Sequence, residues 1–550
     1  MDERKLNGKT IEATGLSRRR FLQGAVVTAA GALAAGSLAA CSDEPESPTT
    51  LPEDIGDGSG IEWDRETEIL IVGYGGAGAV TAITAADAGA ELLVIEKQAK
   101  DVEGQPWNQT NNTRLCYSAV MNFNSEEEAR VYLRRISMGR TPEDVVDSWA
   151  RYACKTVEWL QDIGTDPWDQ GCTTEYPEDV LPEAYETYSQ WAFRGQGPEL
   201  WEGLDNACRQ RNVEVLFNTA GKQLLRNSDG IIIGVLAESD GKQLYIKATK
   251  AVVLSTGGFE FNDDMLKQFI WAYPTRFYAS PATTGDGIKM AQEVGADLWN
   301  TSLIGGRVIP YFPELGHGLM GGTPIPGILV NKYGRRFVRE NWKSHSAAQE
   351  FFRFSTDTGD FPGIPCFSVF DHEAMSKGPV ISATGAMLKT GHYSWSQDNS
   401  AELAKGWIYK GDTIEELAAV LAADPEVGDI MQPEVLAETL RVYNLNAAAG
   451  EDPELGRSGN SLQPLGTPPY YALKMYPGGV NTFGGPKRNG KGQIVDVHGQ
   501  AIPHLYGGGE MGSVIGFLYS GGGWNICEII TSGQIAAENA MAETPWAKLG

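Results

Sequence analysis

A glycine-rich turn between two apolar runs constrains this chain more than any other feature of its sequence. Residues 69–72 (Ile-Leu-Ile-Val) lead into a Gly-x-Gly-x-x-Gly motif at 73–78, and an alanine-rich segment follows. A second apolar run at 92–95 ends on Glu96, 18 residues after the last glycine of the motif. Strand, glycines, helix, strand and carboxylate in this order are typical of a βαβ unit that binds an adenine dinucleotide. We expect its cofactor contacts to include Gly73, Gly75, Gly76, Gly78, Glu96 and Lys97.

Each part of this motif has a physical role. The glycines allow a tight turn, and they let the backbone approach a pyrophosphate at the N-terminus of the following helix. The carboxylate of Glu96 would accept hydrogen bonds from a ribose. Because the glycine pattern alone is weak support, the prediction depends on the flanking strands and on the spacing of the carboxylate.

The bulk composition is that of a globular protein, and it excludes one class of partner. The chain has 550 residues, which is enough for two packed domains, and 42% of them are hydrophobic. Its net charge of −26 opposes binding to the phosphates of nucleic acids. We therefore expect no nucleic-acid partner.

The N-terminus resembles an export signal. Residues 17–22 (Ser-Arg-Arg-Arg-Phe-Leu) match a twin-arginine signal, and an apolar run follows over 25–40. The run ends in Leu-Ala-Ala-Cys at 38–41, which resembles a bacterial lipoprotein cleavage site. We expect residues 1–40 to be a twin-arginine lipoprotein signal and Cys41 to carry a lipid anchor, so that the protein is extracytoplasmic and attached to the cell membrane. The alternative is an ordinary cleaved signal in which Cys41 is incidental.

The segment after the signal and the remaining cysteines carry no catalytic pattern. Residues 41–63 are rich in proline, acidic residues and glycine, which is typical of a flexible linker. Six further cysteines are spaced irregularly, without a CxxC, haem or iron–sulfur pattern. We expect scattered core thiols and no metal site.

Further motifs resemble those of one flavoprotein superfamily. They lie at 256–259 (Thr-Gly-Gly-Phe), 284–288 (Thr-Gly-Asp-Gly-Ile), 330–340 (Val-Asn-Lys-Tyr-Gly-Arg-Arg-Phe-Val-Arg-Glu) and 505–510 (Leu-Tyr-Gly-Gly-Gly-Glu). Together with the glycine turn, they resemble the fumarate reductase and 3-ketosteroid dehydrogenase superfamily over most of residues 66–540. The resemblance implies a non-covalent FAD, with contacts from Asn112, Thr113, Gly257, Gly258, Asp286 and Glu510.

The same resemblance implies the fold class and the domain organisation. We expect an α/β fold in which a Rossmann-like FAD-binding domain receives an inserted α+β cap, or substrate, domain. The FAD-binding domain would comprise residues 64–300 and 474–545, and the cap would comprise residues 301–473. The flavin would lie between the two.

The substrate residues of fumarate reductases are absent from this chain. Those enzymes hold a dicarboxylate with Arg and His and protonate it through an Arg, and the corresponding positions here are Tyr519, Val480 and Ser344. A dianionic substrate would leave unpaired charge in such a pocket, at a cost on the order of several kcal/mol. Fumarate is therefore not the expected substrate.

The terminal segment 516–523 (Gly-Phe-Leu-Tyr-Ser-Gly-Gly-Gly) resembles the ketosteroid dehydrogenases instead. There, a Tyr and a Gly four residues later bind the substrate carbonyl, which implies catalytic roles for Tyr519 and Gly523, while Gly522 would contact the cofactor. Hydride addition to the β-carbon of an enone builds negative charge on that oxygen, and fixed donors there act as an oxyanion hole. The cap Tyr of those enzymes has no counterpart here, so His345 is the candidate proton donor.

These features predict an exported FAD-dependent oxidoreductase that acts on CH–CH bonds. We expect hydride transfer from flavin N5 to an α,β-unsaturated carbonyl compound, steroid-like or another enone, with a separate membrane or extracytoplasmic electron carrier. One alternative is a fumarate-reductase-like enoate reductase, to which Arg307 or Arg339 would supply an acid-binding cation. Two others are a ketosteroid dehydrogenase that runs in the oxidative direction and a flavin-binding lipoprotein without catalytic activity.

Overall fold

The computed structural model describes residues 58, 60–100, 111–172, 174–176, 178–319, 327–341, 348–381 and 393–549. The predicted signal, the lipid anchor at Cys41 and the candidate proton donor His345 lie outside the described residues. None of the helices in the described ranges combines the length and the apolarity of a membrane span.

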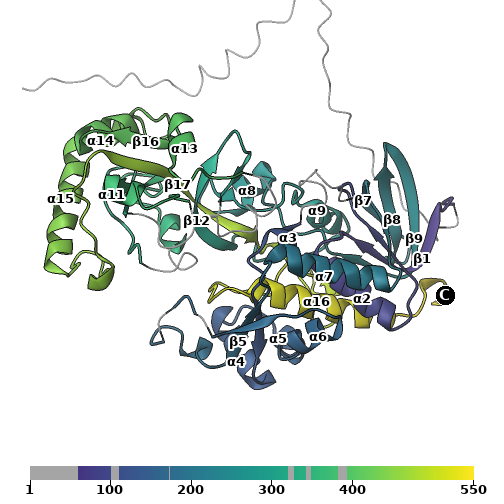
Figure 1. Ribbon diagram of the computed structural model, residues 1–550. Coiled ribbons are helices and arrows are strands. Elements are labelled where there is room, and N and C mark those ends of the chain that lie inside the picture. The colour runs from purple at the N-terminus through teal and green to yellow at the C-terminus, as the bar shows by residue number, and fades with distance from the viewer. Residues whose placement is uncertain are drawn as a thin grey trace, which may run out of the picture. The chain divides into compact units, whose positions relative to one another are not determined.

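A sheet built on the predicted βαβ unit forms the centre of the fold (Figure 1). Strand β1 pairs in parallel with β2 on one side and with β9 on the other. The last four residues of β1 are buried, which explains why its sequence is a continuous apolar run and does not alternate. The strand order is β19-β20-β9-β1-β2-β6, and β8 pairs with both β7 and β9. The strands are β1 (Arg65–Val72), β2 (Leu92–Ile95), β6 (Glu214–Leu216), β7 (Thr219–Arg226), β8 (Ile232–Ser239), β9 (Lys242–Leu254), β19 (Gln493–Val495) and β20 (Ala501–Gly507).

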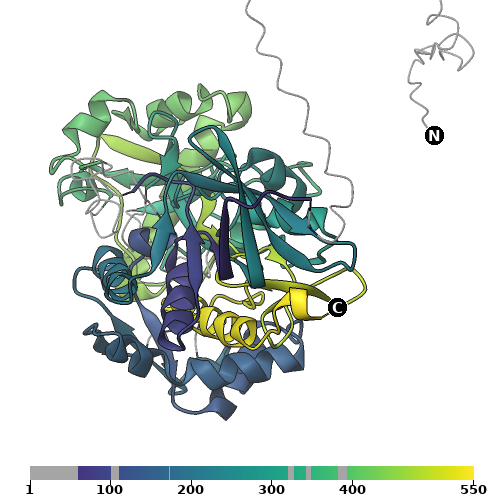
Figure 2. The same cartoon turned by 90° about the vertical axis from the view of Figure 1, so that its right-hand side faces the viewer.

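Three helices from distant parts of the chain lie together against this sheet (Figure 2). They are α2 (Gly76–Asp87), α7 (Gly197–Gln210) and the C-terminal α16 (Trp524–Met541). Helix α2 consists mostly of small residues, so α16 approaches it closely: a Cβ at Gly533 would lie 2.8 Å from the Cβ of Val80. The C-terminal segment therefore returns to the sheet that contains the glycine turn, as the sequence predicts.

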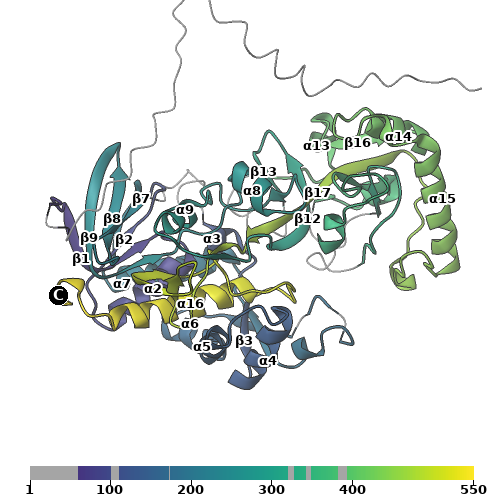
Figure 3. The same ribbon diagram turned by 180° about the vertical axis from the view of Figure 1, so that it is seen from behind.

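A helical segment packs on the other side of α16 (Figure 3). Its core is aromatic, and Trp149 stacks on Trp524 with ring centroids 4.7 Å apart. The helices are α4 (Glu126–Ile136), α5 (Glu143–Ala153) and α6 (Thr156–Asp162), and a small sheet of order β3-β5-β4 joins β3 (Val120–Phe123), β4 (Trp168–Gly171) and β5 (Tyr188–Ala192). The short helix α3 (Asn112–Leu115) packs against α7 instead.

The cap contains a second sheet, of order β13-β12-β17-β15-β14, and two further strands pair with its long strand β17. The strands are β10 (Arg276–Phe277), β12 (Ile304–Phe312), β13 (His317–Gly318), β14 (Ile328–Asn331), β15 (Cys366–Asp371), β16 (Ile408–Gly411) and β17 (Tyr470–Thr482). The helices are α11 (His372–Met375), α13 (Ser400–Ala404), α14 (Ile414–Ala422) and α15 (Pro433–Ala449). Strand β17 runs through the predicted boundary at 473/474 without interruption, so the sheet of the cap continues past this position.

A buried cluster of charges holds part of the cap together. Arg336 pairs with Glu340 at 2.8 Å and with Asp452 at 2.9 Å, while Arg457 contacts Glu340 at 3.3 Å. Two cations thus balance two carboxylates, which is the arrangement that makes burial of charge tolerable. These residues lie away from the glycine turn, so the Arg336–Glu340 pair has a structural role.

The remaining elements connect these units. They are α8 (Asp263–Phe269), α9 (Asp286–Glu293), the two-stranded sheet of β11 (Leu298–Trp299) and β18 (Gly485–Pro486), and the short 3₁₀ turns η1 (Pro182–Ala184), η2 (Gln349–Phe352), η3 (Gly428–Ile430), η4 (Gly459–Ser461) and η5 (Trp546–Lys548). The six described cysteines are free thiols.

We predict that Gly78→Ala disrupts the βαβ unit. A Cβ at this position would lie 2.0 Å from the carbonyl oxygen of Gly73, so the turn must shift. We expect a loss of stability of about 1–3 kcal/mol and a preparation with little bound flavin. Flavin absorbance per chain and the melting temperature measure both effects.

The matched control is Gly466→Ala, because a Cβ at Gly466 meets no atom within 4 Å. Normal flavin content and melting temperature in Gly78→Ala would contradict the prediction.

Candidate active site

A large cavity opens where the central parallel strands end. The residues that follow β1, β2 and β9 all line it, as expected for a ligand site at the carboxyl edge of a parallel sheet. The predicted site residues that line it are Gly73, Gly75, Gly76, Glu96, Lys97, Asn112, Thr113, Gly257, Asp286, Glu510, Tyr519, Gly522 and Gly523. Residues 480–481 and Arg307 bring the cap into the same wall.

The glycine turn leaves no room for side chains at three positions. Gly73 has a φ of +102°, and a Cβ there would lie 2.5 Å from the carbonyl oxygen of Ser255. A Cβ at Gly76 would lie 2.4 Å from the Thr113 hydroxyl. Gly78 does not line the cavity, because it packs against the backbone of Gly73 and thereby fixes the helix to the strand.

The N-terminus of α2 faces this cavity without a cap. Its N-cap residue, Gly75, has no side chain, and the first turn of the helix contains no acidic residue. Its backbone N–H groups and the positive end of the helix dipole therefore favour an anion, which is the requirement of a pyrophosphate.

Glu96 is fixed by its neighbours at the end of β2. Its side chain is buried, one carboxylate oxygen accepts the Tyr74 N–H at 2.8 Å, and the other accepts the Gln98 N–H at 2.9 Å. Each oxygen has a second acceptor site, so the carboxylate can still bind ribose hydroxyls.

Lys97 and Asp286 come together across the cavity wall. The Lys97 Nζ lies 2.6 Å from an Asp286 carboxylate oxygen and 2.8 Å from the Thr284 hydroxyl. Thr284 in turn donates to the other Asp286 oxygen at 2.8 Å. The sequence predicted both charged residues as cofactor contacts, and their pairing explains how two opposite charges lie side by side in one wall.

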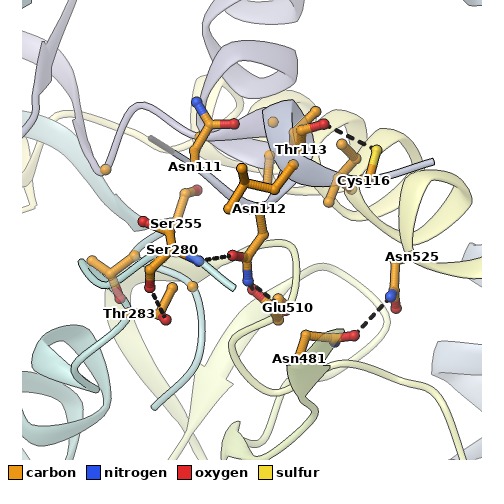
Figure 4. A pocket seen from close by; sticks show the side chains of 18 of the residues that line it. Asn111, Asn112, Thr113, Cys116, Ser255, Ser280, Thr283, Asn481, Glu510 and Asn525 are labelled. Carbon is orange, nitrogen blue, oxygen red and sulfur yellow. Dashed lines mark hydrogen bonds between the residues drawn. The ribbon is translucent and has the colours of Figure 1, made fainter. Parts of the chain in front are cut away.

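Asn112 joins three segments at the middle of the cavity (Figure 4). Its amide nitrogen donates to both carboxylate oxygens of Glu510, at 3.1 and 2.9 Å, and its amide oxygen accepts the Ser280 N–H at 2.7 Å. The side chain of the preceding Asn111 caps α3 by accepting the Arg114 N–H. Because the Asn112 side chain is an amide, it can donate to one segment and accept from another. These contacts hold the Asn-Asn-Thr loop in place.

Two carboxyl groups, the buried Glu260 and the cavity-lining Glu510, lie next to each other behind this loop. Burial raises the pKa of Glu260, and burial together with the charge of Glu260 raises the pKa of Glu510. Glu260 accepts the backbone N–H of Thr482 at 2.5 Å and the Thr482 hydroxyl at 2.9 Å, and neither carboxylate has an ion-pair partner in the described part of the chain. Gly258, a predicted cofactor contact, lies against Glu260 and Thr482 and does not line the cavity.

We predict a pH-dependent stability of the cofactor-free protein from this pair. Because the folded-state pKa of Glu260 lies above the ordinary value of 4.5, its stabilising contribution is complete below about pH 4.5 and is lost as the pH rises through the raised pKa. Glu260→Gln removes that ionisation, so the free energy of unfolding should fall less between about pH 5 and about pH 8 than in the wild type. Urea unfolding across this range measures it.

The control is Glu238→Gln at a half-exposed surface position. Equal pH dependence in Glu260→Gln and in the wild type would mean that Glu260 ionises normally, against this prediction.

The predicted donor pair lies at the cap end of the cavity. The ring of Tyr519 stacks parallel to that of Phe483, with centroids 6.2 Å apart, and burial raises the pKa of its hydroxyl while nearby Arg307 lowers it. Gly523 is the N-cap of α16, with a φ of +100°, and a Cβ there would lie 2.9 Å from the Met121 backbone nitrogen. The hydroxyl and the N-terminus of α16 therefore both border the space in which a substrate would lie.

An amide pair that the sequence did not indicate lies beside them. Asn525, in the first turn of α16, donates to the Asn481 side chain of β17 at 2.8 Å, and both line the cavity (Figure 4). The sequence signal for these two residues is their position next to Val480 and to the recognised segment 516–523. Cys116 also lines the cavity, and burial raises the pKa of its thiol to about 12, so it is not a thiolate.

The polar lining fits a cofactor of the predicted kind. Ser255 Oγ, Asn111 Nδ2 and Glu528 Oε2 are buried cavity-lining atoms without a hydrogen-bond partner. Buried polar groups are normally satisfied, so these atoms call for a polar ligand. An uncapped helix N-terminus, a ribose-type carboxylate and unsatisfied donors and acceptors along one cavity match the phosphates, sugars and ring of FAD.

Comparisons with known proteins support this assignment. A family model described as FAD binding domain matches residues 68–526. The chain is 28% identical to the digoxin reductase of Eggerthella lenta, over 97% of this chain and 98% of that protein. It is 26% identical to a probable fumarate reductase of Shewanella frigidimarina, over 86% of this chain and 74% of that protein.

Among solved structures, the fold is similar to that of a 3-ketosteroid Δ1-dehydrogenase from Sterolibacterium denitrificans. The TM-score is 0.74 at 21% identity, over 87% of this chain and all of that one. An open flavocytochrome c3 fumarate reductase gives a TM-score of 0.65 at 22% identity, over 87% of this chain and 79% of that one. The predicted fold class is confirmed.

Proposed function

The chain belongs to the FAD binding domain family and is an FAD-dependent oxidoreductase that acts on CH–CH bonds, and we propose that it reduces a carbon–carbon double bond conjugated to a carbonyl group. The observation that carries the proposal is the position of Tyr519 and Gly523 together on the cavity wall. Relatives named digoxin reductase and vinyl phenol reductase support the reductive direction.

The protein residues hold the cofactor along the cavity. The N-terminus of α2 faces the pyrophosphate, Glu96 binds a ribose, and Asn112 with Glu510 borders the ring end. When bound, FAD supplies the hydride. We propose that the FAD is bound non-covalently.

Tyr519 and Gly523 then act on the substrate carbonyl. The Tyr519 hydroxyl and the Gly523 N–H donate to its oxygen, which becomes negative when the β-carbon receives hydride. Because both donors are held by packing, Tyr519 against Phe483 and Gly523 against β3, little reorganisation accompanies the reaction. A raised pKa keeps Tyr519 in the protonated form that can donate.

The α-carbon of the substrate must also receive a proton. We propose His345 as the donor of this proton because of its position in the sequence. His345 lies outside the described residues. The electrons come from a separate carrier at the membrane or outside the cytoplasm, in keeping with the twin-arginine signal and the lipid anchor at Cys41 that we propose.

We predict that Tyr519→Phe lowers the rate of substrate reduction on the order of a hundredfold, because one oxyanion donor is lost. The phenyl ring preserves the stacking on Phe483, so flavin content should not change. Reduced enzyme mixed anaerobically with enones such as cyclohex-2-enone or a 3-ketosteroid, followed by flavin absorbance, measures the rate.

Tyr311→Phe is the control, because this tyrosine lies on β12 outside the cavity lining. An unchanged rate in Tyr519→Phe would remove the tyrosine from the reaction.

We predict that Cys41→Ser releases the protein from the membrane without abolishing export. The substitution removes the proposed acylation site, whereas the twin-arginine segment at 17–22 remains. Fractionation of cells into cytoplasmic, membrane and extracytoplasmic material shows where the flavoprotein lies. Replacing Arg18 and Arg19 by Lys should instead retain it inside the cell, and membrane attachment of Cys41→Ser would contradict a lipid anchor.

A further inference from the structure

One cation of the cavity lining has no ion-pair partner among the residues that the structure describes. Arg307 lies on β12, where its backbone faces Gly478 of β17, and its side chain lines the cavity. Among the described residues no carboxylate pairs with it, and its Nε is buried without a hydrogen-bond partner. The neighbouring Gly306 and Gly478 have no side chains that could fill the space around it.

The other cation of the described cavity wall has a carboxylate partner, and the carboxylates there accept ion pairs or hydrogen bonds from the protein. Lys97 pairs with Asp286 at 2.6 Å, and Glu528 pairs with Arg488 at 2.7 Å. Glu96 accepts two backbone N–H groups, and Glu510 accepts the amide of Asn112. In the described lining, Arg307 is therefore the cation that has no carboxylate partner and that an anionic ligand could neutralise.

The position of this cation connects it with the substrate end. Arg307 lies near enough to Tyr519 for its positive charge to lower the pKa of the tyrosine hydroxyl. The adjacent part of the cavity wall, Val480 and Asn481, carries no charge. A half-buried cation without a partner destabilises the protein, because the charge has lost part of its hydration. An anionic group of the ligand would offset this loss by forming a charge-assisted hydrogen bond.

We propose that the substrate carries one carboxylate, which Arg307 binds while Tyr519 and Gly523 hold the conjugated carbonyl oxygen. This inference rests on the proposed function and specifies its substrate class as a monoanionic enone. A dianion does not fit, because the described lining offers a single uncompensated cation. Arg339 does not serve this subsite, since it donates to the Gly456 carbonyl and lies outside the cavity lining.

A matched pair of compounds tests the subsite in the holoenzyme. Cyclohex-2-enone and 4-oxocyclohex-2-ene-1-carboxylate share the enone and differ by one carboxylate. Perturbation of the flavin spectrum gives the Kd of each, and anaerobic reoxidation of the reduced enzyme gives each rate. We expect the wild type to bind the keto acid at least about tenfold more tightly than the enone, as a charge-assisted contact implies.

Substitutions at Arg307 and Arg339 then test which residue causes the preference for the keto acid. Arg307→Met should abolish the tenfold preference, Arg307→Lys should retain part of it, and the control Arg339→Met should retain all of it. Equal affinity of the wild type for the two compounds would overturn the proposal, and so would an undiminished preference in Arg307→Met. The wild-type comparison stands even if a variant fails to fold.

A third compound distinguishes failure of the carboxylate subsite from failure of the enone function. Cyclohex-1-ene-1-carboxylate, an unsaturated acid without a ketone, is the third compound. If it alone reoxidises the enzyme, and does so in an Arg307-dependent manner, the carboxylate subsite stands and the enone function is wrong. If the neutral enone reacts as well as the keto acid, the enone function stands and the carboxylate subsite is wrong.

Discussion

The close approach of backbone to backbone at the end of β1 is the constraint on which the site depends. A side chain at Gly73 would collide with the carbonyl of Ser255, and one at Gly78 would collide with Gly73 itself. Since strand β1, strand β9 and helix α2 meet there without intervening side chains, their ends converge on one cavity. The glycine turn, Glu96 and Ser255 all line the cavity at this convergence.

Two pairs of opposite charges at the cavity wall join neighbouring segments of the chain. Asp286 compensates Lys97 from α9, and Arg488 compensates Glu528 on α16 while its guanidinium also binds the carbonyls of the loop at 507–512. These two ion pairs neutralise charges at the cavity wall, whereas Glu96 and Glu510 have hydrogen-bond donors instead of cations as partners. Arg307, the cation without a carboxylate partner among the described residues, lies at the end where the cap contributes.

The parts of the site that the sequence predicts are contiguous. The glycine turn, Glu96 and the Tyr519–Gly523 segment each depend on residues a few positions apart, so local patterns identify them. The contact of Asn481 with Asn525 arises where a cap strand meets the last helix, and no pattern in either segment encodes that meeting. The predicted end of the cap at residue 473 falls inside β17, where Lys474 interrupts the apolar residues although the strand continues to Thr482.

That continuity has a mechanical consequence. Strand β17 pairs with β12, β15 and β16 of the cap sheet and with β10, and its last residue, Thr482, is hydrogen-bonded to Glu260 beside the cofactor loop. A strand paired along its length resists bending, so the cap cannot swing about this crossing as a loosely tethered lid. Any tilt of the cap must pull on Thr482 and hence on the carboxyl pair, which makes the electrostatics at the flavin edge sensitive to what the cap has bound.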